Sequence, residues 1–331
     1  MKWDSEVRAI RFREPGGPEV LESIRVPLPP PPEGHLRVRV ASSGVNRADL
    51  VQRRGRYPPP PGAPEEILGL EYAGRVEAVG PGCRLRKVGD PVMGIVGGGG
   101  YAEALNVPEQ ETIRIPRGVD PVEAGAIPEV FITAWDALMG QARLQAGETV
   151  LIHAVGSGVG TAALQLALAA GARPIGTSRT PEKVRRAGEL GLSRGIVAED
   201  DWPEAVLEHT DGRGADVILD LVGASYLEGN LAVLAPGARW IVVGVPGGSS
   251  GPVDLRRLMS RRATMRGTVL RPRPAAEKVL LARDFESRIV PLFDEGSLRP
   301  VVDAVFGPDE AAEAHRRMEA SRSFGKLLIG W

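Results

Sequence analysis

The first part of the chain alternates apolar and polar residues in short runs. Such alternation indicates half-buried strands, because successive side chains of a strand point to opposite faces of a sheet. The runs expected to form strands are Val7–Phe12, Leu36–Ser42, Tyr72–Val79, Pro91–Ile95, Ala102–Val107 and Thr112–Ile115. Turns rich in proline and glycine separate them, as at Pro58–Pro64 and Gly97–Gly100. Many short strands joined by such turns predict a compact barrel or sandwich.

The pattern changes near Asp120, where apolar strand-like runs begin to alternate with helical ones. The expected strands are Thr149–Ala154, Arg173–Thr177, Gly195–Val197, Asp216–Leu221, Arg239–Val243 and Thr264–Gly267. The expected helices are Val159–Ala170, Pro181–Leu190, Trp202–His209, Tyr226–Leu234 and Asp254–Arg261. Regular alternation of this kind predicts a doubly wound domain, in which helices cover both faces of a parallel sheet.

The pattern changes again after about residue 272. A helix (Ala275–Phe285), a strand (Val301–Phe306), a helix (Pro308–Ala320) and a short strand (Lys326–Ile329) are expected there. The predicted fold class is therefore α/β, with a β-rich part and a doubly wound part. We place the segment boundaries at residues 1–122, 123–268 and 269–331.

The composition excludes several classes of protein. The 41 basic and 42 acidic residues give a net charge of −1, so nothing draws the chain to nucleic acid or anionic membranes. No apolar run reaches the roughly 18 residues of a membrane span, and no secretory leader follows Met1. The lone Cys83 permits neither an intramolecular disulfide nor a thiolate-rich metal site. We expect a soluble cytoplasmic protein.

The strongest single motif lies where the strand at Thr149–Ala154 runs into Gly156-Ser157-Gly158-Val159-Gly160 and an alanine-rich helix. Small residues there allow backbone amides to approach a pyrophosphate at the positive end of the helix. Val155 and Ser157 stand where a strict G-x-G-x-x-G motif would have glycine, so the motif alone is weak. Its position within a series of strand–helix units predicts a bound dinucleotide.

The end of the second strand indicates which dinucleotide. NAD sites carry Asp or Glu there to bind the ribose 2′-hydroxyl, whereas this chain has Ser178, followed by Arg179 and Lys183. A hydroxyl with nearby cations would bind a 2′-phosphate, which a carboxylate would repel. We therefore predict NADPH. The alternative is that Arg179 and Lys183 merely face solvent.

Six motifs in order give the chain a resemblance to a known family. They are Gly44–Asp49, Leu68–Gly74, Val88–Val92, Pro128–Trp135, Asp220–Gly223 and Phe324–Leu327. With them the chain resembles the medium-chain dehydrogenase/reductase superfamily, in its zinc-free quinone oxidoreductase and ζ-crystallin branch. The resemblance implies a GroES-like catalytic domain completed by the C-terminal segment, with a Rossmann domain inserted between. It also implies a homodimer that pairs the edge strand near Thr264–Val269.

Zinc-dependent alcohol dehydrogenases of the same superfamily would need Cys about where Asn46 stands and His about where Leu70 stands. They also carry a structural lobe with four cysteines, which one cysteine cannot form. The four histidines lack ligand spacing, and we interpret all of them as structural: His153 in a buried strand, and His35, His209 and His315 in a loop or on polar helix faces. We predict no metal.

The resemblance also implies the residues of the site. It places Asn46 near the nicotinamide ribose, Thr133 near the nicotinamide, Gly156, Ser157, Gly158 and Val159 at the pyrophosphate, Val222, Val243, Gly244 and Val245 at strand ends lining the cofactor, and Thr268, Val269 and Ser323 at the nicotinamide pocket. Catalytic contributions are expected from Asn46, Tyr57 and Thr133. Tyr57 would stack on the substrate or donate a hydrogen bond to it, or else only cover apolar surface. Asp49 would either orient Tyr57 or cap a short helix.

Without a Lewis acid, the hydride acceptor must already be electrophilic. Quinones and conjugated enones meet this condition, so the expected function is an NADPH-dependent quinone oxidoreductase that transfers hydride directly. The nearest alternative is an enoyl-thioester or enone reductase, for which Tyr57 is the obvious proton donor. The alternative outside catalysis is a nucleotide- or RNA-binding protein like ζ-crystallin, against which the neutral charge argues.

Overall fold

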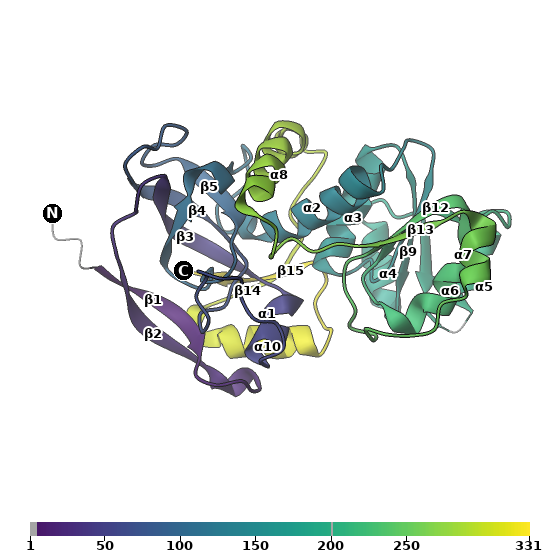
Figure 1. Ribbon diagram of the computed structural model, residues 1–331, viewed down its shortest axis with the longest axis horizontal. Helices are drawn as coiled ribbons and strands as arrows, with labels where there is room; N and C mark the ends of the chain where they lie inside the picture. Colours follow the sequence, from purple (N-terminus) through teal and green to yellow (C-terminus); the bar gives the residue numbers. More distant parts are fainter. Residues whose placement is uncertain (1–4, 200) are drawn as a thin grey trace. The chain divides into compact units, whose positions relative to one another are not determined.

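The computed structural model describes residues 5–199 and 201–331 (Figure 1). The chain folds into two compact units. The first runs to Ile132 and includes Leu270–Trp331, and the second is Thr133–Val269. The α/β fold class predicted from the sequence is confirmed.

The first unit is built on a seven-stranded sheet with the order β14-β15-β3-β4-β5-β7, in which β6 also pairs with β3. Its strands are β3 (His35–Val45), β4 (Glu71–Val79), β5 (Pro91–Ile95), β6 (Ala104–Pro108), β7 (Ile113–Arg114), β14 (Val302–Phe306) and β15 (Lys326–Gly330). The C-terminal strand β15 runs antiparallel to β3, with Leu327 opposite Val45, so the end of the chain completes the first sheet. A separate antiparallel pair, β1 (Ser5–Phe12) and β2 (Leu21–Leu28), belongs to the same unit.

Apolar side chains on the inner faces of these strands form the core of the first unit. Leu36, Val38 and Val40 of β3 pack with Tyr72 and Val76 of β4. The helices of this unit are α1 (Arg47–Arg53), α8 (Ala275–Arg288), α9 (Val290–Asp294) and α10 (Ala311–Glu319). Helix α2 (Pro128–Trp135) begins in this unit and ends in the other.

The second unit contains a six-stranded parallel sheet with the order β10-β9-β8-β11-β12-β13. Its strands are β8 (Thr149–Ile152), β9 (Arg173–Ser178), β10 (Arg194–Val197), β11 (Ala215–Asp220), β12 (Leu234–Val242) and β13 (Thr264–Gly267). The helices that flank this sheet are α3 (Gly158–Ala169), α4 (Pro181–Gly188), α5 (Trp202–His209), α6 (Leu227–Ala232) and α7 (Leu255–Arg261) (Figure 1). The strand order reverses between β8 and β11, and sheets of this type bind ligands at the carboxyl ends of strands at such a point.

Several sequence expectations need correction. The helix expected at Tyr226–Leu234 is shorter, because Leu234 is already the first residue of β12. The first strand of the parallel sheet ends at Ile152, so His153 lies in the following turn and not in the strand. The sequence did not predict β2, whose residues are all at least partly exposed, or the π-helical turn at Asp136–Gln141. In the described part of the chain, no helix has the length and apolar character to span a membrane.

Candidate active site

The turn after β8 forms an open cradle of backbone amides. Ser157 caps α3, because its Oγ accepts a hydrogen bond from the Gly160 amide at 3.0 Å. A Cβ atom on Gly160 would collide with the carbonyl oxygen of Ala154 and lie 2.8 Å from the backbone of Val155, so only glycine fits there. The amides of Gly158 and Val159 have no acceptor among the described residues. Two open donors at the positive end of a 12-residue helix suit a pyrophosphate.

At the end of β9, Ser178 is 7% exposed, and its Oγ accepts a hydrogen bond from the Thr180 amide at 3.2 Å. The next residue, Arg179, is exposed and makes no hydrogen bond or ion pair within residues 5–199 and 201–331. Lys183 lies in the first turn of α4 and is half-buried. Glu182, in the first turn of α4, is engaged by Arg185 at 2.7 Å.

His153 belongs to a buried polar network behind the cradle. Its Nε2 donates to Asn230 Oδ1 at 2.7 Å, and its Nδ1 accepts from the hydroxyl of Thr177 at 2.8 Å. Asn230 in turn donates to Asp220 Oδ2 at 3.1 Å, and so does the indole nitrogen of Trp240. Burial lowers the pKa of His153, so the imidazole is neutral. These contacts agree with the prediction of a structural role.

Asp220 also shapes the turn that carries Val222. Its Oδ1 accepts from the amides of Val222 and Gly223, each at 2.8 Å. Val222 and the segment Val243–Val245 follow neighbouring strands, and the Val222 carbonyl accepts from the Gly247 amide at 2.7 Å. The structure therefore gathers Val222, Val243, Gly244 and Val245 at the carboxyl ends of β11 and β12.

Thr268 follows the edge strand β13. Its hydroxyl accepts from Gln141 Nε2 at 2.6 Å and donates to Asp136 Oδ2 at 3.2 Å, both in the π-helical turn. Val269 is 49% exposed, whereas Thr133 in α2 is 8% exposed. Internal hydrogen bonds therefore hold Thr268 in place.

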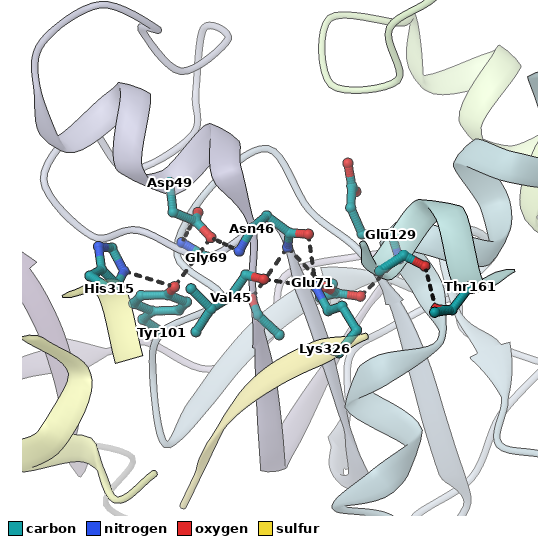
Figure 2. Close-up of polar contacts among 12 residues, drawn as sticks. Val45, Asn46, Asp49, Gly69, Glu71, Tyr101, Glu129, Thr161, His315 and Lys326 are labelled. Atoms are coloured by element: carbon teal, nitrogen blue, oxygen red, sulfur yellow. Dashed lines mark hydrogen bonds and ion pairs between the residues drawn. The ribbon is translucent and has the colours of Figure 1, made fainter. Parts of the chain in front are cut away.

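In the first unit, a buried ion pair fixes Asn46 (Figure 2). The Lys326 ammonium donates to Glu71 Oε1 at 2.6 Å, Asn46 Oδ1 at 2.8 Å and the Val45 carbonyl at 2.9 Å. Asn46 Nδ2 donates to the same Glu71 oxygen at 2.8 Å. The side chains of Lys326 and Glu71 are 3% and 0% exposed. All three ammonium protons have an acceptor, which a buried charge requires.

The sequence did not point to Glu71 or Lys326 as site residues, although both lie in quoted motifs. The available signal was a single charged residue within each of two otherwise apolar motifs, Leu68–Gly74 and Phe324–Leu327. Burying one such charge alone is costly, so two of opposite sign are expected to pair. Nothing in the sequence shows which strands lie side by side.

Asp49 caps helix α1. Its Oδ2 accepts from the Asn46 amide at 2.8 Å and from the Tyr101 hydroxyl at 3.2 Å, and its Oδ1 accepts from the Gly69 amide at 3.1 Å (Figure 2). Burial raises the pKa of Asp49 to about 6. Of the two roles considered for Asp49, the capping role is confirmed.

The prediction that His315 lies on a polar helix face is wrong. Its side chain is fully buried where α10 packs near α1. Arg53 donates to its Nδ1 at 2.9 Å, and a guanidinium can only donate, so its proton is on Nε2, 3.2 Å from the Tyr101 hydroxyl. Burial, with Arg53 adjacent, lowers the pKa of His315 to about 3. His35 also departs from expectation, because it begins strand β3 instead of lying in a loop.

Tyr57 is half-buried and lies on a cation that the sequence did not reveal. The guanidinium of Arg271 is 4.9 Å from the centroid of the Tyr57 ring and donates to the Tyr57 carbonyl at 3.3 Å. It also donates to Gln52 Oε1 at 2.7 Å and to the Gly97 carbonyl at 2.8 Å. The Tyr57 hydroxyl has no hydrogen-bond partner in the described part of the chain and remains available to a ligand.

Glu129, in the first turn of α2, is a second acid that the sequence did not single out. Its amide donates to Glu71 Oε2 at 2.8 Å. Burial, then the neighbouring Glu71 charge, raises the pKa of Glu129 to about 8.

Ser323 lies in the turn before β15 and is half-exposed. Among the described residues, no three His, Cys, Asp or Glu side chains converge as a metal site would require.

Two family models match the chain. Residues 32–117 match the alcohol dehydrogenase GroES-like domain, and residues 158–283 match a domain described as zinc-binding dehydrogenase. The quinone oxidoreductase of Pseudomonas aeruginosa is 35% identical, over 97% of this chain and 99% of that protein. The quinone oxidoreductase of Lama guanicoe is 32% identical, over 98% of this chain and 97% of that protein.

Solved structures show the same fold. A quinone oxidoreductase from Pseudomonas syringae has a TM-score of 0.88 at 30% identity, covering 98% of this chain and 100% of that one. A protein described as an NAD-dependent alcohol dehydrogenase has a TM-score of 0.88 at 33% identity, covering 98% and 99%. The CurK enoyl reductase has a TM-score of 0.86 at 26% identity, also covering 98% and 99%.

Proposed function

Because the chain belongs to the medium-chain dehydrogenase/reductase superfamily, in its quinone oxidoreductase branch, we propose that this oxidoreductase reduces quinones with NADPH and needs no metal ion. The family implies a nicotinamide cofactor. The choice of NADPH, the quinone substrate and the absence of a metal are the parts that we propose.

The observation that carries the metal-free reaction is the ammonium of Lys326. Zinc-dependent members would have Cys and His about where this chain has Asn46 and Leu70. Here Asn46 and Glu71 instead accept hydrogen bonds from Lys326. The side-chain oxygen atoms that could bind a metal cation are therefore already bound to the Lys326 ammonium. A divalent ion beside this ammonium would be repelled.

The residues of the second unit fit the proposed cofactor. The open amides of Gly158 and Val159 suit its pyrophosphate. Ser178 with the unpaired Arg179 suits a 2′-phosphate, since a guanidinium binds phosphate oxygens with two parallel hydrogen bonds. NADPH, when bound, supplies a hydride from C4 of its nicotinamide to the substrate.

Tyr57 supports a substrate with a planar ring. Its ring is fixed on one side by Arg271, so the other face can stack on a planar ring with little further loss of freedom. A quinone is planar and already electrophilic, and hydride addition to it needs no Lewis acid. Arg271 is thus a positioning residue for Tyr57.

The test is a set of acceptors with EDTA-treated protein. We expect oxidation of NADPH in preference to NADH, with quinones as the fastest acceptors, and no change on adding zinc. Activity that is lost on chelation and restored by zinc would contradict the proposal. So would failure to bind either nicotinamide dinucleotide.

A second candidate is reduction of an enoyl thioester. The likeness to the CurK enoyl reductase favours it, and the unpartnered Tyr57 hydroxyl could donate a proton. Faster turnover of a crotonyl thioester than of any quinone would support this candidate over the first.

A further inference from the structure

Three carboxyl groups and two cations lie close together at the start of α2: Asp49, Glu71, Glu129, Lys326 and Arg271. With every group ionised, this cluster would carry one excess negative charge, although all of its members except the half-buried Glu129 are buried. Low polarity makes such an excess costly, so one carboxyl group is expected to keep its proton. The hydrogen bonds show which one.

Glu71 and Asp49 are both stabilised as carboxylates. Glu71 has the Lys326 ammonium at 2.6 Å on one oxygen and the Glu129 amide at 2.8 Å on the other. Asp49 accepts three hydrogen bonds, two of them from backbone amides. Hydrogen bonds donated to a carboxylate favour its ionised form over the protonated one.

Glu129 has no such support. Its carboxyl group makes no hydrogen bond or ion pair with any described residue. The bond from its amide to Glu71 fixes its backbone, and its side chain extends away from the Glu71–Lys326 pair (Figure 2). Arg271 and Lys326 lower its pKa, but they do not offset burial and the charges of Glu71 and Asp49, which bring the pKa to about 8. Glu129 is therefore protonated near pH 7.

The phenol of Tyr57 is the other group here that could donate a proton. Tyr57 interacts electrostatically with two members of the cluster, Glu129 and Arg271. Burial raises the pKa of its phenol above the usual value of 10.0. A general acid is most effective when its pKa lies near the working pH. Of the two groups, Glu129 meets this condition.

We propose that Glu129 is the proton donor that completes reduction of the substrate, with Tyr57 holding the substrate ring. This inference rests on the proposed quinone reductase function. The quinone gains a hydride from the nicotinamide, and the electron pair that arrives with it leaves a negative charge on a quinone oxygen. The O–H bond of Glu129 then breaks and an O–H bond forms on that oxygen, giving the hydroquinone. Glu129 is left as a carboxylate and takes a proton back from solvent.

The first test is the pH dependence of quinone reduction. The rate should fall as the pH rises through about 8, because Glu129 then loses its proton. Glu129→Gln should lower the rate at pH 7 and remove this alkaline limb, and Glu129→Asp should restore part of the rate. Glu111→Gln is the matched control, because Glu111 is also half-buried with a raised pKa but interacts with Lys278 and His35 instead. An unchanged pH profile in Glu129→Gln would overturn the proposal.

A second comparison separates proton donation from hydride transfer. N-methylacridinium is a cation that accepts a hydride and needs no proton. Glu129→Gln should slow quinone reduction and leave acridinium reduction near the wild-type rate. Equal slowing of both acceptors would mean that Glu129 only supports the structure. Absence of activity with both acceptors in the wild-type protein would instead overturn the proposed function.

A readout independent of turnover is the carboxyl carbon resonance of Glu129. In protein labelled with ¹³C-glutamate, one resonance that is absent from Glu129→Gln should titrate near pH 8, without added cofactor. Titration of that resonance near the ordinary glutamate value of 4.5 would contradict the proposal.

Discussion

Lys326 holds Asn46 in a single orientation through its ion pair with Glu71. The Asn46 amide is fixed at both ends, since Oδ1 accepts from Lys326 and Nδ2 donates to Glu71. Any contact that Asn46 makes to a ligand therefore depends on Glu71 and Lys326, which are distant from it in the sequence. Removing one member of a buried pair leaves the other charge without a partner, which typically costs about 3–5 kcal/mol.

Lys326→Met should therefore lower the free energy of unfolding by about 3–5 kcal/mol. The double variant Lys326→Met/Glu71→Gln should recover part of this loss, because no unpaired charge remains. Urea titration of the three proteins measures the difference. A single variant as stable as the wild type would show that the pair is not formed in solution.

Arg179 should distinguish NADPH from NADH. Loss of a hydrogen bond to a charged group costs about 1.5–3 kcal/mol, or roughly a 10- to 100-fold loss of affinity. Arg179→Ala should weaken NADPH binding by this factor and leave NADH binding nearly unchanged, as measured by calorimetry. Arg185→Ala is the control, because Arg185 lies six residues further on, in α4, but is engaged by Glu182 and Glu189. Equal losses for both nucleotides would contradict a role at the 2′-phosphate.

At this scale, local sequence predicted the residues next to the strand ends but not the buried charges. Gly158 and Val222 follow apolar strands and Ser178 ends one, so their place in a parallel sheet could be inferred from order alone. Lys326 and Glu71 are 255 positions apart, and Arg271 meets Gln52 across 219 positions. Such pairs depend on which strands and loops become neighbours, which local pattern does not encode.

The turn from β8 to α3 is the element on which dinucleotide binding depends. Its shape combines the Ser157 cap with the close approach of Gly160 to Ala154 and Val155. The sequence predicted this element from its small residues, although the glycine spacing was not the strict motif. The physical requirement is at Gly160, where the helix meets the preceding turn.

Gly160→Ala should force the turn apart, at a cost of about 1–3 kcal/mol, and weaken the binding of both nicotinamide dinucleotides. Gly188→Ala in α4 is the matched control, because a Cβ there would meet no atom within 4 Å. That substitution should be neutral or stabilise the helix by up to about 1 kcal/mol. Thermal unfolding and nucleotide binding of the two variants measure the contrast, and equal behaviour would refute it.

At the scale of the whole molecule, the feature that bears on assembly is the edge of the parallel sheet. The sequence predicted that the strand near Thr264 would be an edge strand, and the topology confirms this. All four residues of β13 are exposed, and Met265 and Val269 present apolar surface, 44% and 49% exposed. An exposed edge strand is a template for pairing with another chain. We propose that two copies of the chain pair there as a homodimer.

Met265→Lys should convert the dimer to a monomer, because like charges would face each other across the two-fold axis. Sedimentation velocity measures the change in mass, and circular dichroism checks that the fold is kept. Leu280→Lys, on an exposed face of α8, is the control and should remain dimeric. A wild-type protein that sediments as a monomer would contradict the proposed pairing.

The most direct test of metal-free hydride delivery is a single turnover in buffer freed of metal by EDTA. Protein mixed with a quinone and NADPH should oxidise the nicotinamide in one phase, and deuterium at C4 should slow that phase. Added zinc should leave the rate unchanged. A rate that is insensitive to deuterium, or one that is abolished by EDTA and restored by zinc, would contradict direct transfer from NADPH to an acceptor that needs no metal.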